Sequence, residues 1–210
     1  MTERLPIDLG GLFLWPQTSR LVRSPLKQKV RLSPFELGGQ EAAIVLSRYR
    51  AMKSCCITGH RKTGISENLI CSIVQELTLA AIADGANHFY MGCSWGVDLI
   101  AGQVWTDMFL DWTAVKPCAD HGVGVWLEAM MEYRDRVLKQ AQEIETLRER
   151  YKPGCLNARN EWMVNRSEIV IAIFDGRQRG GTKHCLSYAR RQGKRIIWYD
   201  LRDGQIKSVN

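Results

Sequence analysis

The sequence predicts an α/β fold with a mostly parallel sheet and helices on both faces. Short apolar segments alternate with longer amphipathic segments from residue 53 onward, and such alternation is typical of parallel strands joined by right-handed helical crossovers. The segment 168–174 (EIVIAIF) is nearly all apolar, as expected of a central strand buried on both faces. The composition, 45% hydrophobic and 24% charged, is that of a globular protein.

The first half of the alternation contains two strands and two helices. A short buried strand is expected over 54–58 (SCCIT), followed by a helix that Ser66 caps and whose apolar residues recur at helical spacing. A second strand over 88–92 (HFYMG) then precedes a helix over 94–109, with Ser94 as its cap.

The second half contains three more strands and three more helices. In chain order we expect a strand over 113–118, a helix over 124–140, a short helix over 155–167, the apolar strand over 168–174, a helix over Thr182–Arg191 and a strand over 195–199. The last of these strands is expected to close the sheet.

The first fifty residues differ from the rest of the chain. Four of the six prolines lie there, at positions 6, 16, 25 and 34, and their spacing leaves no room for a helix of useful length. Eight Lys and Arg against four Asp and Glu give this part a net charge of +4, out of +7 for the chain. We therefore predict a Pro-rich N-terminal extension over 1–50, extended over 1–33 with a short helix capped by Ser33, and a single domain over 51–210.

Composition excludes several classes of protein. The sequence shows no apolar run of membrane-spanning length and no signal peptide, so a cytoplasmic protein without a membrane partner is expected. The seven cysteines are odd in number and form no C-x-x-C pair, which favours reduced thiols and predicts no metal site. The basic charge is compatible with nucleic acid and equally with a nucleotide or phosphate ligand.

Glycine and polar residues follow successive strands of the predicted sheet. In parallel α/β sheets, ligands bind beyond the carboxyl ends of the strands. A glycine pair before a helix also presents free N–H groups and the positive end of the helix dipole to an anion. Each of these segments alone is also an ordinary turn, but their occurrence at three strand ends favours an anion-binding crevice. The candidate ligand-binding residues are Thr58, Gly59, His60, Arg61, Gly92, Trp95, Gly96, Asp98, Arg159, Asn160, Asp175, Gly176, Gly180, Gly181 and Thr182.

Four separated motifs carry a resemblance to a known family. In order they are TGHR (58–61), G-x-x-x-G-V-D (92–98), R-N-x-x-M-V (159–164) and D-G-x(3)-G-G-T (175–182). Over residues 53–199 the chain resembles the YpsA-like family of the SLOG superfamily, whose distant members include the Lonely Guy phosphoribohydrolases and the DNA-processing protein of competence. The resemblance implies a Rossmann-like, doubly wound sheet. It also implies a short strand over 143–147, where the local pattern alone continues the preceding helix to residue 150.

The resemblance implies a nucleotide pocket with named walls. Gly59, His60 and Arg61 would line one wall, with Gly92, Gly96 and Asp98 along another. Arg159 matches the arginine that faces phosphate in the related enzymes, and Gly180, Gly181 and Thr182 would hold the phosphate. Lonely Guy enzymes place a glutamate after this threonine to act on the N-glycosidic bond, whereas this chain has Cys185 there. Only Asp98 and Asp175 could replace it as catalytic carboxylates, which leaves open whether the protein is an enzyme.

Three functions follow as hypotheses. The favoured one is a sensor or regulator that binds a nucleotide or nucleotide-derived ligand of the NAD or ADP-ribose kind. The alternatives are an N-glycosidase acting on a nucleoside monophosphate and a DNA-binding protein related to the competence protein. No cofactor is predicted. A homo-oligomer and a nucleic-acid partner are left open.

Overall fold

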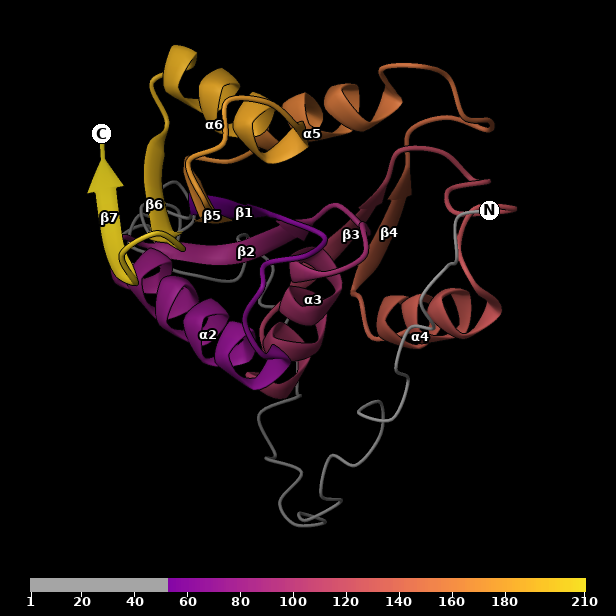
Figure 1. Cartoon of the computed structure of the whole chain (residues 1–210), viewed down its shortest axis with the longest axis horizontal. Helices are drawn as coiled ribbons and strands as arrows, with labels where there is room; N and C mark the ends of the chain where they lie inside the picture. Colours follow the sequence, from indigo (N-terminus) through magenta and orange to yellow (C-terminus); the bar gives the residue numbers. More distant parts are fainter. Residues whose placement is uncertain (1–52) are drawn as a thin grey trace, which may run out of the picture. The chain divides into compact units, whose positions relative to one another are not determined.

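The computed structural model describes residues 53–210, and the predicted N-terminal extension with its arm and short helix lies outside them. The described chain forms a seven-stranded sheet in the order β4-β3-β2-β1-β5-β6-β7 (Figure 1). The strands are β1 (Lys53–Gly59), β2 (Ala86–Met91), β3 (Trp112–Lys116), β4 (Glu143–Thr146), β5 (Ile169–Phe174), β6 (Arg195–Asp200) and β7 (Gln205–Val209). The first six strands are parallel to one another, and β7 runs antiparallel to β6.

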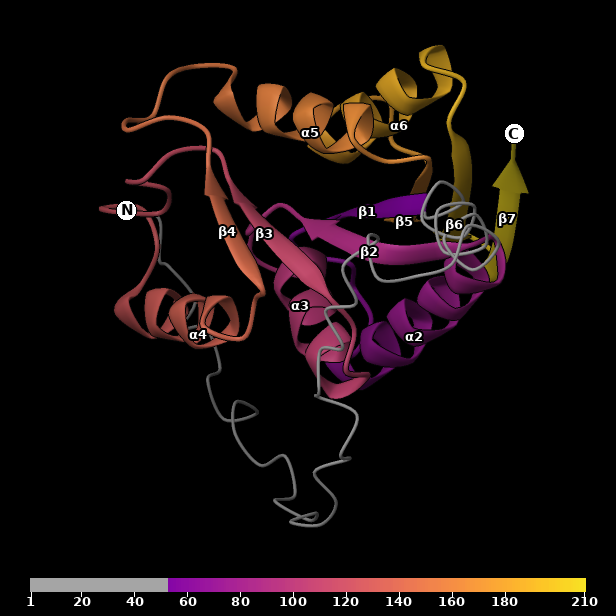
Figure 2. The same ribbon diagram turned by 180° about the vertical axis from the view of Figure 1, so that it is seen from behind.

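Helices cover both faces of this sheet. Figures 1 and 2 show α5 and α6 packed on one face and α2, α3 and α4 on the other. These helices are α2 (Glu67–Ala83), α3 (Val97–Asp107), α4 (Glu128–Leu138), α5 (Cys155–Asn165) and α6 (Gly181–Arg191). The predicted Rossmann-like, doubly wound α/β fold is therefore confirmed. Within residues 53–210, no helix combines the length and the apolar character needed to cross a membrane.

The order of the strands places a topological switch point between β1 and β5. The chain runs outward from β1 through β2 and β3 to β4, and then returns to pair β5 with the free side of β1. At such a point the connections from the two strands leave toward opposite faces of the sheet, which opens a space beyond their carboxyl ends. The residues that follow Gly59 and Phe174 border this space.

Two apolar layers hold the sheet in place. The larger lies against α2 and α3 and includes the fully buried Leu77, Phe89, Trp105 and Trp112. Trp105 satisfies its buried indole N–H by donating to the Thr78 hydroxyl at 2.9 Å. The smaller layer packs α5 and α6 on the other face. Strands buried on both faces provide a rigid support for the loops at their carboxyl ends.

The structure corrects two predicted boundaries. The helix predicted over 124–140 begins at Glu128, and Gly124, inside the predicted range, takes a positive φ of 70° that an α-helix does not contain. The helix predicted from residue 94 begins at Val97, with Gly96 as its N-cap. The prediction that Ser94 caps it was wrong, because the Ser94 N–H donates to the Asp98 carboxylate instead.

Two further predictions concern the strands at the edges of the sheet. The strand over 195–199 does not close the sheet, because β7 adds an antiparallel strand outside β6. The turn Asp203–Gly204 allows this hairpin, since Gly204 adopts a φ of 68°. At the opposite edge, the short strand implied by the family resemblance over 143–147 is confirmed as β4.

Candidate functional site

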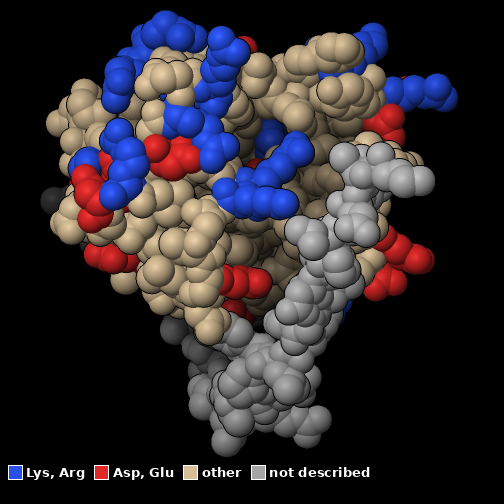
Figure 3. Space-filling model, viewed as in Figure 1, with Lys and Arg blue, Asp and Glu red and all other residues tan. Residues whose placement is uncertain are grey.

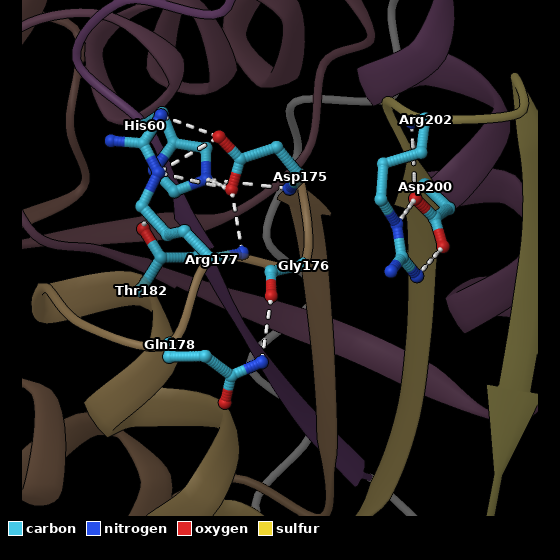
Figure 4. A network of polar contacts seen from close by, with 8 residues as sticks. All are labelled: His60, Asp175, Gly176, Arg177, Gln178, Thr182, Asp200 and Arg202. Atoms are coloured by element: carbon cyan, nitrogen blue, oxygen red, sulfur yellow. Dashed lines mark hydrogen bonds and ion pairs between the residues drawn. The ribbon is translucent and has the colours of Figure 1, made fainter.

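The carboxyl ends of β1 and β5 meet through His60 and Asp175. Gly59 pairs with Ile173 in the sheet, so the residues that follow these strands are neighbours. His60 Nε2 lies 2.9 Å from Asp175 Oδ1 (Figure 4). The His60 side chain is 8% exposed and that of Asp175 26% exposed. The two residues that the sequence places after separate strands therefore form one pair at the switch point.

The second nitrogen of His60 faces the start of α6. The Thr182 Oγ1 atom lies 3.5 Å from His60 Nδ1. In the neutral tautomer that donates from Nε2 to Asp175, Nδ1 is free to accept a hydrogen bond from this hydroxyl. Carboxylate, imidazole and hydroxyl thus form a line that ends in the first turn of α6. The Phe174 ring, with its centroid 5.6 Å from that of His60, packs beside them.

Arg177 completes this group at its solvent side. Its Nε donates to Asp175 Oδ2 at 2.8 Å, its backbone N–H donates to Oδ1 at 3.1 Å, and its Nη2 also contacts Oδ2. These bonds hold the pKa of Asp175 well below its usual range. Burial lowers the pKa of His60, and Asp175 opposes that shift. At neutral pH the group therefore combines an ionised Asp175 with a neutral imidazole.

The N-terminus of α6 is open toward the same place. Gly180 is its N-cap, with a φ of 111° and no side chain to cap the first turn. Gly180 and Gly181 are exposed, and α5 holds this turn in place because Asn160 Nδ2 donates to the Gly181 carbonyl at 3.2 Å. The N–H groups of an uncapped first turn, together with the helix dipole, favour an anion.

Arg159 forms a second, buried network at the end of β2. The residue is 4% exposed. Its Nη1 donates to Asp98 Oδ2 at 3.2 Å and its Nη2 to the Ser94 hydroxyl at 2.9 Å. Its Nε is buried and has no hydrogen-bond partner among the described residues. Burial raises the pKa of Asp98, while Arg159 acts in the opposite direction. This network joins α5 to the turn between β2 and α3.

The glycines of the first two motifs allow close packing. A Cβ at Gly92 would lie 1.2 Å from Arg159 Nη1, so only glycine leaves room for the guanidinium. A Cβ at Gly59 would lie 2.5 Å from the Val97 side chain. Gly96, at a φ of 88°, lies against the backbone of Arg61, whose carbonyl oxygen would be 2.7 Å from an added Cβ. These glycines thus have a structural reason, and their predicted contact with a ligand stays a prediction.

The remaining predicted residues lie around these two networks. Thr58 is buried in β1, where its side chain meets the Cys185 thiol. Trp95 packs edge-to-face on Tyr133 of α4, with ring centroids 5.7 Å apart. Arg61 is exposed. Cys185 itself is fully buried, and burial raises the pKa of its thiol well above the usual range. A neutral, buried thiol cannot take over the role of a catalytic carboxylate.

Sequence reasoning missed two arginines near the site. Arg177 pairs with Asp175, and Arg202 pairs in the same way with Asp200 through Nε at 2.8 Å and Nη2 at 2.6 Å (Figure 4). Arg202 also lies over Gly176, where an added Cβ would be 2.6 Å from its Nη1. A signal was present, because both pairs are Asp-x-Arg at the end of a strand.

Comparison with known proteins places the chain in a family. The family model YpsA, described as the YspA SLOG family, matches residues 45–201. The chain belongs to this family. UPF0398 proteins of Bacillus thuringiensis (strain Al Hakam) and Bacillus cereus (strain Q1) are each 23% identical to it over 174 residues, which cover 72% of this chain and 94% of theirs.

Solved structures with a similar fold include two DNA processing proteins. The Helicobacter pylori protein, described with a single-stranded DNA binding mode, has a TM-score of 0.50 and 20% identity over 70% of this chain and 64% of its own. The Streptococcus pneumoniae protein has a TM-score of 0.50 and 16% identity over 73% of this chain and 52% of its own. At these identities the likeness concerns the fold, and it agrees with the Rossmann-like sheet of the YpsA family member described here.

Proposed function

We propose that this SLOG protein binds a nucleotide or a nucleotide-derived ligand, of the NAD or ADP-ribose kind, at the carboxyl edge of its sheet and acts as a sensor or regulator. The observation that carries the proposal is the meeting of His60 and Thr182 at the uncapped N-terminus of α6. Hydrogen-bond donors and the positive end of a helix dipole converge there at the topological switch point.

The phosphate of the ligand would bind in the first turn of α6. Backbone N–H groups at Gly181 and Thr182 and the Thr182 hydroxyl are donors of the kind that phosphate oxygens accept. An anion beside His60 would favour its protonated form and add a charge-assisted hydrogen bond. Arg61, exposed at the end of β1, would add a cation at the rim. Arg159 would act indirectly, because Asp98 and Ser94 already occupy its guanidinium.

Binding without turnover is favoured over hydrolysis of an N-glycosidic bond. Such hydrolysis needs a carboxylate to activate water or to stabilise the oxocarbenium-like transition state. Asp98 is buried against Arg159, and Asp175 is bound by His60 and Arg177. Cys185, at the position of the Lonely Guy glutamate, is a buried thiol. These engagements support a sensor in preference to a phosphoribohydrolase.

A thermal-shift experiment tests the proposal. We expect AMP, ADP-ribose, NAD or a cyclic nucleotide at a hundred times its dissociation constant to stabilise the protein by about 2.7 kcal/mol. Thr182→Val replaces the hydroxyl with a methyl group and should weaken the shift, whereas Thr146→Val on the exposed edge strand β4 should leave it unchanged. Absence of a shift with every nucleotide would refute ligand binding. Release of free base from the same panel, followed by chromatography, would refute the sensor role.

A further inference from the structure

The outer side of α6 carries basic charge that the candidate site does not use. Residues 176–199 contain seven Lys and Arg and no Asp or Glu. Five of these cations have no ion-pair partner within residues 53–210: Arg179, Lys183, Arg190, Arg191 and Lys194. By contrast, α4 mixes both signs, with Arg134 paired to Asp135. A helix surface of one sign is unusual for a solvated face, where opposite charges are normally interspersed.

These cations follow one line along the helix. Lys183, Ser187 and Arg190 are spaced at i, i+4 and i+7, so they lie on the same face of α6. Arg191 flanks this line, and Lys194 follows the end of the helix. We call these four cations, Lys183, Arg190, Arg191 and Lys194, the α6 stripe. Figure 3 shows Lys and Arg gathered over the part of the surface where Figure 1 places α6, and bordering a hollow near the centre of this face.

We propose that the α6 stripe binds the phosphate backbone of single-stranded nucleic acid. Eleven helical residues span about 16 Å, a length that several consecutive phosphates can follow. The stripe begins one turn from Gly180 and Gly181, so a strand lying along it reaches the N-terminus of α6. Only an unpaired strand can place a base there. The preference for a single strand over a duplex therefore rests on the proposed function, whereas the electrostatic contact does not.

Two other negatively charged partners, a membrane surface and an acidic protein, fit the α6 stripe less well. A helix that binds a membrane surface inserts large apolar side chains, and stable protein interfaces centre on buried aromatic or aliphatic anchors. The exposed large apolar side chains of residues 53–210 lie elsewhere, and none is on α6. Phosphates contacted by Lys and Arg need no such anchors.

Fluorescence anisotropy with a labelled twenty-nucleotide oligothymidylate tests the proposal. With the four cations of the stripe each neutralising one phosphate, the logarithm of the binding constant should fall with the logarithm of salt concentration with a slope of about −3. Arg190→Glu with Lys194→Glu should weaken binding at least tenfold and make the slope shallower. Lys139→Glu with Arg150→Glu changes the net charge equally near β4, at the opposite edge of the sheet, and should have less than a twofold effect.

Several outcomes would overturn the proposal. They are absence of binding at 50 mM salt, equal weakening by the two double variants, tighter binding of a hairpin duplex, and binding of phosphatidylserine vesicles but not of the oligonucleotide. Thermal shifts with the nucleotide panel on the Arg190→Glu/Lys194→Glu variant separate this proposal from the previous one. A nucleotide shift that persists while oligonucleotide binding is lost supports two distinct functions of the two regions.

Discussion

Two carboxylate–cation groups lie at the carboxyl edge of the sheet and differ in their exposure to solvent. The side chains of Asp98 and Arg159 are 7% and 4% exposed, whereas that of Arg177, which binds Asp175, is 54% exposed. A desolvated ion pair is costly to break, because either partner left alone is a buried charge. An exposed pair contributes little to stability and can exchange partners with a ligand. Similar residue types therefore form a buried structural ion pair in one place and a solvent-accessible charged group in the other.

The largest effect is expected from the glycine that accommodates the buried pair. Gly92→Ala should lower the free energy of unfolding by about 4 kcal/mol, because its Cβ would displace the Arg159 guanidinium and leave Asp98 unpaired. Urea unfolding followed by tryptophan fluorescence measures this. Gly181→Ala is the matched control, since the nearest atom to its Cβ is Asn160 Nδ2 at 3.8 Å. Equal destabilisation by the two substitutions would contradict a stabilising role of the Asp98–Arg159 ion pair.

A double-mutant cycle tests the interaction between Asp98 and Arg159 directly. Arg159→Met should cost about 3 kcal/mol, because it leaves the Asp98 carboxylate buried without its cation. Adding Asp98→Leu removes that charge, so the double variant should be more stable than Arg159→Met alone. The coupling is read from the unfolding free energies of the four proteins. Additive effects would mean that the pair contributes no interaction of its own.

The stability of the protein should also depend on pH through the buried His121. Burial lowers the pKa of His121 to about 4, and Arg159 acts in the same direction. Between the usual pKa of 6.5 and this value the unfolded chain binds more protons, so stability is lost as the pH falls. The loss between pH 6.5 and 5 should be about 2 kcal/mol.

His121→Phe isolates this contribution. The aromatic ring can keep its edge-to-face contact with Trp126, 4.9 Å between centroids in the wild type, while nothing titrates at the position. We therefore expect the variant to lose less stability than the wild type between pH 6.5 and 5, as measured by urea unfolding at each pH. Burial also lowers the pKa of His60 and His88, but both are present in the two proteins. Parallel pH profiles would show that His121 titrates normally.

Much of this fold could be predicted because its signals are local. The apolar run at β5 and the helical spacing of α2 identify their elements without tertiary information. The antiparallel strand β7 was missed because its residues, QIKSV, mix polar and apolar types, and it depends on pairing with β6. The strand β4 followed from family resemblance and not from periodicity, since all but one of its four residues are exposed.

The candidate site was predictable in position but not in its partners. Strand ends indicated where His60, Asp98 and Asp175 would gather. Sequence alone could not show that Asp98 is neutralised by Arg159, because the two residues are 61 positions apart and meet only through packing of α5 on the sheet. Nor could it show that Gly92 leaves room for the guanidinium of Arg159, because that contact also depends on how α5 packs.

The smallest change in stability is expected on the exposed side. Arg177→Gln should leave the free energy of unfolding almost unchanged, because an ion pair with an exposed partner contributes little to stability. The pKa of His60 should nevertheless rise, since Arg177 lowers it, and so should the pKa of Asp175, which loses the hydrogen bonds from Arg177. NMR titration of the His60 ring protons and of the Asp175 carboxyl measures both.

Arg179→Gln removes the same charge from the same loop without touching Asp175, so it should leave both pKa values nearly unchanged. Equal shifts in the two variants would mean that His60 senses only net charge. The accessible group would then not be a coupled unit that a bound phosphate could retune.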